Sequence, residues 1–122
     1  MMKILILDDH SFYANEINEY LTEMGYKVFF AKNYHDGELI TRKYGPFDIS
    51  LLDVILQNGK TGIGFANINE DKLGRIMFIT GCNDKTTVEA ITNNTRYASA
   101  SKQNNIWKPL KAFLNGATPK MV

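Results

Sequence analysis

The chain has 122 residues, of which 44% are hydrophobic and 22% are charged, a composition typical of one globular domain with its own core. The formal net charge is +1 and the basic residues are spread along the chain, which argues against direct binding of nucleic acid. A single cysteine, Cys82, excludes an internal disulfide, and no apolar run has the length of a signal peptide or a membrane span. These features predict a cytoplasmic protein that does not enter the membrane.

Apolar runs and helical spacing alternate along the chain. In order, they predict a strand at 4–7, a helix at 13–24, a strand at 28–30, a helix at 34–44, a strand at 49–52, a short helix at 63–68, a strand at 75–79, a helix at 85–95, a short strand at 106–107 and a last helix at 110–115. Strands that alternate with helices are typical of an α/β fold with a parallel sheet and right-handed crossovers. The polar stretch 96–105 gives no clear prediction.

Side chains able to carry chemistry stand where the predicted strands end. Asp8 and Asp9 follow the first strand, Asp53 follows the third, Thr80 the fourth and Lys108 the fifth. In an open parallel sheet, ligands bind beyond the carboxyl ends of the strands, so these side chains are expected to meet in one crevice. Taken singly, each has an ordinary explanation, since an Asp can cap a helix and a Lys can be a solvated charge. Their coincidence at four strand ends favours a functional site.

The converging carboxylates predict a metal ion, because they repel one another unless a cation lies between them. An all-oxygen site suits a hard cation, and Mg²⁺ takes one or two protein carboxylates while keeping other positions for water or phosphoryl oxygens. A carboxylate beside such an ion can act as a nucleophile and become an aspartyl phosphate. Lys108 would then offset charge on the phosphoryl oxygens, and Thr80 would donate a hydrogen bond to one of them.

Four strings give the chain a resemblance to the receiver domains of two-component response regulators: residues 3–10 (KILILDDH), 47–53 (FDISLLD), 78–81 (FITG) and 107–110 (WKPL). The ordered set of acidic pair, Asp, Thr and Lys-Pro resembles this family over nearly the whole chain. The resemblance implies a flavodoxin-like, doubly wound, five-stranded parallel sheet with strand order 2-1-3-4-5. It also implies that residues 1–122 form a single receiver domain, with no output domain visible.

The same resemblance implies a role for each candidate residue around the metal. Asp53 matches the residue that accepts the phosphoryl group, and Asp9 matches a direct Mg²⁺ ligand. Asp8 matches an acidic residue that acts on the ion through a water molecule, and the main-chain carbonyl of Ile55 would complete the protein ligands.

Thr80 and Lys108 match the hydroxyl group and the lysine that hold the phosphoryl group in the family. The implied phosphoryl donor is a sensor histidine kinase, a phosphotransfer protein or a small phosphodonor such as acetyl phosphate, and the implied output is a downstream protein target. Such a domain catalyses its own phosphorylation and slow dephosphorylation and does not turn over an external substrate.

Several positions depart from the family pattern. Gln57 stands where proline is frequent, and the segment from Gly62 to Thr80 is shorter than usual, which predicts a stunted third helix. The segment from Thr80 to Lys108 is longer than usual. Asn105 occupies the position of the usual aromatic switch residue, so the usual coupling to Thr80 lacks its aromatic side chain here.

Two other functions compete with that of a phosphorylated receiver. The first is a receiver-like interaction module that works without phosphorylation, but such a module has no need of mutually repelling carboxylates. The second is a metal-dependent phosphatase on a similar sheet, which usually needs a second acid just after the nucleophile, where this chain has Ile55. The cognate kinase and the oligomeric state do not follow from the sequence.

Overall fold

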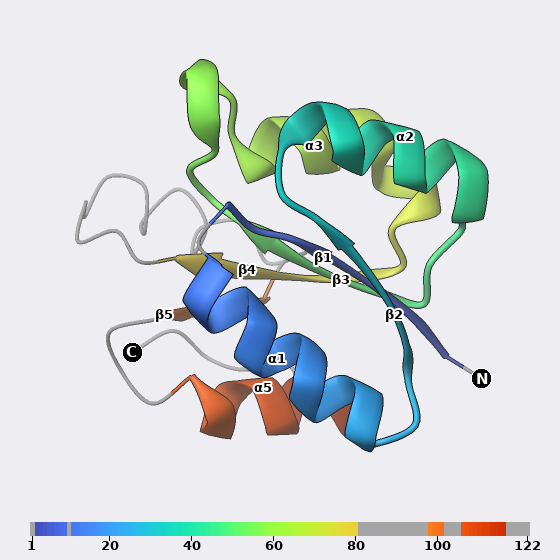
Figure 1. Cartoon of the computed structure of the whole chain (residues 1–122), viewed down its shortest axis with the longest axis vertical. Helices are drawn as coiled ribbons and strands as arrows, with labels where there is room; N and C mark the ends of the chain where they lie inside the picture. Colours follow the sequence, from blue (N-terminus) through green and yellow to red (C-terminus); the bar gives the residue numbers. More distant parts are fainter. Residues whose placement is uncertain (1, 10, 81–97, 102–105, 117–122) are drawn as a thin grey trace.

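The computed structural model describes residues 2–9, 11–80, 98–101 and 106–116 (Figure 1). In chain order the elements are β1 (Lys3–Leu7), α1 (Ser11–Glu23), β2 (Lys27–Ala31), α2 (Tyr34–Tyr44), β3 (Ile49–Asp53), α3 (Gly62–Asn69), β4 (Arg75–Thr80), β5 (Ala98–Ser101) and α5 (Trp107–Leu114), with short 3₁₀ turns at Gln57–Gly59 and Glu70–Lys72. The helix predicted at 85–95 lies outside the described residues.

The strands form one five-stranded parallel sheet in the order β2-β1-β3-β4-β5. The predicted α/β class, the parallel sheet and the strand order are thus confirmed. In this order the chain moves to one side of β1 to form β2 and then to the other side to form β3. The switch point therefore lies between β1 and β3, and this is where open α/β sheets bind their ligands.

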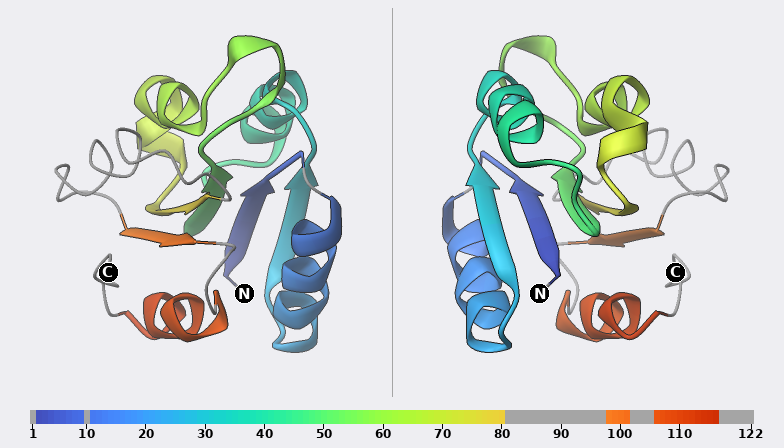
Figure 2. Two further views of the ribbon diagram at one scale, coloured as in Figure 1. Left: turned by 90° about the vertical axis from the view of Figure 1, so that its left-hand side faces the viewer. Right: turned by 90° about the vertical axis from the view of Figure 1, so that its right-hand side faces the viewer.

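Helices cover both faces of the sheet: α2 and α3 lie on one face, and α1 and α5 lie on the other (Figure 1 and Figure 2). Successive strand residues alternate between the two cores, because side chains of a strand point to opposite faces. Ile4 and Ile6 pack in the core beside α1 and α5, while Leu5 and Leu7 pack in the core beside α2 and α3. A strand buried on both faces is a continuous apolar run, which explains why β1 was predictable.

The fifth strand was predicted at the wrong segment. Ala98–Ser101 pair with β4, whereas Ile106 caps α5 and Trp107 is its first residue. Alanine and serine have weak strand preference, so β5 is defined by its pairing with β4 and carries little local signal. The apolar residues after it serve the last helix instead, since Ile106, Leu110 and Phe113 are buried in one core.

Two helices begin at side-chain caps. The side chain of Asn33 accepts a hydrogen bond from the N–H of Asp36 at 2.8 Å, and α2 then spans the predicted range 34–44. Thr61 Oγ1 accepts one from the N–H of Gly64 at 3.0 Å and starts α3, which is short, with eight residues. Within the described ranges, every helix falls short of the length and apolar character that a membrane crossing requires.

Candidate metal centre

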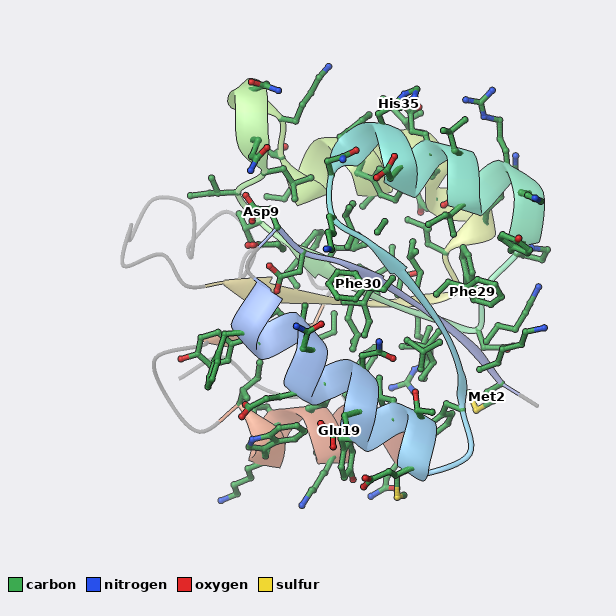
Figure 3. The ribbon with its side chains drawn as sticks, viewed as in Figure 1. Met2, Asp9, Glu19, Phe29, Phe30 and His35 are labelled. Carbon is green, nitrogen blue, oxygen red and sulfur yellow. The ribbon has the colours of Figure 1, made fainter. Side chains whose placement is uncertain are left out.

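Three carboxylates meet at the carboxyl edge of the sheet, at the switch point between β1 and β3. Asp8 and Asp9 directly follow β1, and Asp53 is the last residue of β3. One carboxylate oxygen of each residue lies within 4.8 Å of those of the other two. Figure 3 shows Asp9 at this end of the molecule, beside the start of α1. The structure thus brings together the three acidic side chains that stand at the predicted strand ends.

The carboxylates are held in a largely buried setting. Asp8 and Asp53 are each 3% exposed, and Asp9 is half-buried. The main-chain N–H of Asp8 donates to the carbonyl of Ala31 at 3.1 Å, which extends the pairing of β1 with β2 by one residue. The N–H of Ile55 donates to Oδ1 of Asp53 at 3.4 Å. Burying several like charges costs free energy unless a cation compensates them, so the arrangement favours a bound metal ion.

The donor set fits a magnesium ion. Oxygens on opposite sides of one octahedral Mg²⁺ lie about 4 Å apart, because each Mg–O distance is about 2.1 Å. A spread of up to 4.8 Å therefore suits two direct carboxylate ligands and a third that acts through a water molecule. All of the donors are oxygens, which are the ligands that hard cations prefer.

A tight hairpin, residues 55–61, follows β3, and we call it the site hairpin. Ile55 and Thr61 pair across it as antiparallel neighbours. At its tip, Asn58 has a φ of 61° and Gly59 a φ of 73°, the two positive values that a type I′ turn requires. Asn-Gly between two pairing segments is a strong hairpin signal, and this signal could have revealed the element from the sequence.

Gly62 brings the chain back against the end of β3. Its N–H donates to the carbonyl of Val54 at 2.8 Å. A Cβ atom at position 62 would lie only 2.0 Å from the main-chain oxygen of Asp53. Glycine is therefore required where α3 begins beside Asp53, and Gly62 is a positioning residue for that carboxylate.

Lys60 connects the site hairpin to α2. Its Nζ lies 5.1 Å from the centroid of the Tyr34 ring, and this ring packs edge-on against Phe65 of α3 at 5.3 Å. Burial and, to a lesser extent, the carboxylate of Glu38 raise the pKa of the Tyr34 phenol above its ordinary value. This contact between Tyr34 and Lys60 was not predicted, because it joins segments that are distant in the sequence.

Two further predicted site residues, Thr80 and Lys108, follow later in the chain. Thr80 is the last residue of β4, and the prediction for its hydroxyl group lies outside the described part of the structure. Lys108 is exposed, in the first turn of α5, and forms no ion pair with a described carboxylate. The ring of the preceding Trp107 packs on Tyr20 at 5.1 Å. Trp107 therefore contacts α1 at a point about 13 Å along the helix axis from the first residue of that helix, given the helical rise per residue.

Comparison with known proteins places this arrangement in context. The family model of the response regulator receiver domain matches residues 4–109. A CheY-like response regulator receiver domain protein from Methanospirillum hungatei JF-1 is 20% identical, with a TM-score of 0.78 over 94% of this chain and 92% of that chain. The chemotaxis protein CheY4 of Vibrio cholerae is 21% identical, with a TM-score of 0.77 over 94% of this chain and 98% of that one.

A third similar structure is a response regulator protein from Burkholderia pseudomallei with a phosphorylated aspartic acid, a calcium ion and citrate. It is 23% identical, with a TM-score of 0.74 over 92% of this chain and 66% of that chain. At these identities the structural likeness concerns the fold alone. Comparison with curated proteins finds no significant match. The family model nevertheless covers most of the sequence and every predicted site residue, and the chain belongs to the response regulator receiver domain family.

Proposed function

We propose that this receiver domain accepts a phosphoryl group on Asp53 in a Mg²⁺-dependent reaction and signals through the resulting change of conformation. The observation that carries the proposal is the convergence of three carboxylates at the switch point of the sheet. The B. pseudomallei response regulator, whose structure holds a phosphorylated aspartic acid and a calcium ion, supports the same chemistry here.

In this proposal Asp53 is the nucleophile. One carboxylate oxygen forms a bond to phosphorus while the bond between phosphorus and the leaving atom of the donor breaks, and the leaving group keeps that electron pair. The N–H of Ile55, which donates to Oδ1, orients the carboxylate. Mg²⁺, held by Asp9, Asp53 and the carbonyl of Ile55 and through water by Asp8, would supply positive charge that offsets the phosphoryl oxygens.

The proposed phosphoryl donor is a sensor histidine kinase or a phosphotransfer protein, with acetyl phosphate as its small-molecule substitute. Thr80 and Lys108 are the proposed partners of the phosphoryl oxygens, and the family match, which runs to residue 109, supports their inclusion. Because such donors act in the cytoplasm, we place the domain there.

Intact-mass measurement tests the central claim. The purified chain is incubated with acetyl phosphate and Mg²⁺, beside a sample with a chelator and beside the Asp53→Asn variant. We expect the mass of one added phosphoryl group in the first sample and in neither control. A folded protein that gains no phosphoryl group, or an Asp53→Asn variant that gains as much as the wild type, would overturn the proposal and favour an interaction module that works without phosphorylation.

A second test concerns Lys108. If its ammonium group reaches the phosphoryl oxygens, Lys108→Ala slows the formation of the adduct by about 100-fold, the usual effect of removing one stabilising donor. Lys111→Ala, which removes an exposed lysine from the same helix, is the matched control and leaves the rate unchanged. Equal rates in the two variants would show that Lys108 stays outside the site, in the exposed position on α5 that it occupies here.

A further inference from the structure

Three lysine side chains gather over aromatic rings at the amino edge of the sheet, the edge opposite to the carboxylates. Lys3 begins β1, Lys27 begins β2 and Lys43 lies in the last turn of α2. Their Nζ atoms lie 5.8, 5.6 and 5.3 Å from the ring centroids of Phe47, Phe29 and Tyr44, respectively. We call these six residues the lysine–aromatic edge. Figure 3 shows Phe29 and Met2 at this end of the molecule and Asp9 at the other.

The rings of this edge form one continuous group with Phe29 in the middle. The centroid of Phe29 lies 4.8 Å from that of Tyr44 and 5.5 Å from that of Phe47. Phe47 is buried, whereas Tyr44 and the adjacent Met2 are each 41% exposed. The lysines therefore stand on a group of packed aromatic rings that is open to solvent on its outer side.

The positive charges of Lys3, Lys27 and Lys43 have no ion-pair partner within the described part of the chain. Lys3 and Lys27 are register partners on the neighbouring parallel strands β1 and β2, so two positive charges start side by side at this edge. The side chain of Asp48 accepts the main-chain N–H of Lys3 at 2.7 Å, and the Lys3 ammonium group donates a hydrogen bond to the main-chain carbonyl of Tyr44. Arg42, exposed in the same turn of α2, adds a further charge. Such a surface is complementary to an anionic partner.

The geometry selects between two kinds of anion. Single-stranded nucleic acids bind through bases stacked on free aromatic faces. Here the lysine ammonium groups stand over the rings, so a base would have to displace them. Carboxylates need only the ammonium groups themselves. We infer that the lysine–aromatic edge binds an acidic segment of a protein partner, with its carboxylates on Lys3, Lys27 and Lys43 and its apolar atoms on Tyr44 and Met2.

The test uses fluorescence anisotropy with a labelled peptide of ten glutamates. The variant Lys27→Gln/Lys43→Gln removes two charges and two ammonium–ring contacts from the edge. Lys60→Gln/Lys111→Gln is its matched control, because these lysines are also exposed and lie 5.1 and 5.6 Å from the rings of Tyr34 and Tyr20. We expect the first variant to weaken binding at least tenfold and the control to change it by less than twofold.

Three outcomes would overturn the inference: no binding of the peptide to the wild-type chain, an equal loss in both double variants, or tighter binding of a ten-residue oligothymidylate than of the peptide. The last outcome would make the edge a nucleic-acid surface. The inference does not rest on phosphorylation, so Asp53→Asn should bind the peptide as the wild type does. All four substituted lysines are exposed, and circular dichroism checks that each variant is folded.

Discussion

The main-chain carbonyl group of Asp53 occupies the space that a Cβ atom of residue 62 would need. A Cβ at position 62 would lie 2.0 Å from the oxygen and 2.9 Å from the carbon of the Asp53 carbonyl group. A flexible side chain could rotate away from such a contact, but these atoms belong to the end of β3. Any larger residue at position 62 must therefore displace either the start of α3 or the strand that carries the proposed nucleophile.

Gly62→Ala is expected to lower the free energy of unfolding by about 3 kcal/mol, the upper range for overpacking. Gly59→Ala is the control: a Cβ there has no atom within 4 Å, and its cost comes from the positive φ alone, about 1 kcal/mol. Urea unfolding measures both values. Similar losses in the two variants would mean that the contact with Asp53 relaxes freely and that Gly62 does not position the site.

At the scale of elements, the start of α3 depends on one side chain. Thr61 Oγ1 accepts the N–H of Gly64, and Thr61 also pairs with Ile55 across the site hairpin. We expect Thr61→Ala to lower the free energy of unfolding by about 1 kcal/mol, since one helix N–H loses its acceptor. Thr61→Ser keeps the hydroxyl group and should retain most of that stability in the same urea titration. An equal loss in both would attribute the effect to packing rather than to capping.

Elements with strong local signals were predictable from the sequence. β1 and β3 are buried on both faces and read as continuous apolar runs, and Asn33 marks the start of α2. The rule that ligands bind beyond the carboxyl ends of parallel strands then located the acidic residues, because it needs only the ends of β1 and β3. β5 has no such signal, since Ala98–Ser101 become a strand only through pairing with β4, which depends on distant residues.

The interpretation of Lys108 shows how one misplaced element affects a site. Lys108 was placed at a strand end because 106–107 were predicted to be the fifth strand, whereas these residues begin α5. The lysine–aromatic edge could not be predicted from the sequence for a related reason. Lys3, Lys27 and Lys43 are far apart in the sequence, and only the parallel register and the end of α2 bring them to one edge.

At the scale of the whole molecule, a metal ion that binds only the folded state stabilises it. The expected gain is about 2.7 kcal/mol when Mg²⁺ is present at 100 times its dissociation constant. Thermal unfolding should therefore shift upward on addition of Mg²⁺ and return when a chelator is added. Asp9→Asn should lose most of this shift, and without Mg²⁺ it should be more stable than the wild type, because one repelling charge is removed.

Asp71→Asn, which removes an exposed acid from a 3₁₀ turn, is the control for the loss of one negative charge. It should respond to Mg²⁺ as the wild type does. If Asp9→Asn also keeps the full response to Mg²⁺, the ion binds somewhere other than among Asp8, Asp9 and Asp53.

The length of β1 sets the electrical separation between the two ends of the molecule. From Lys3 to Asp8 the strand spans about 17 Å. At physiological ionic strength charges are screened over about 8 Å. The roughly two negative charges of the proposed phosphoryl group on Asp53 would therefore be scarcely felt at the lysine–aromatic edge, even without a Mg²⁺ ion to offset them. In dilute buffer, where screening extends to about 30 Å, the same group would weaken the attraction of that edge for anions. Ionic strength thus determines whether the two ends of this small domain act independently or as one dipole.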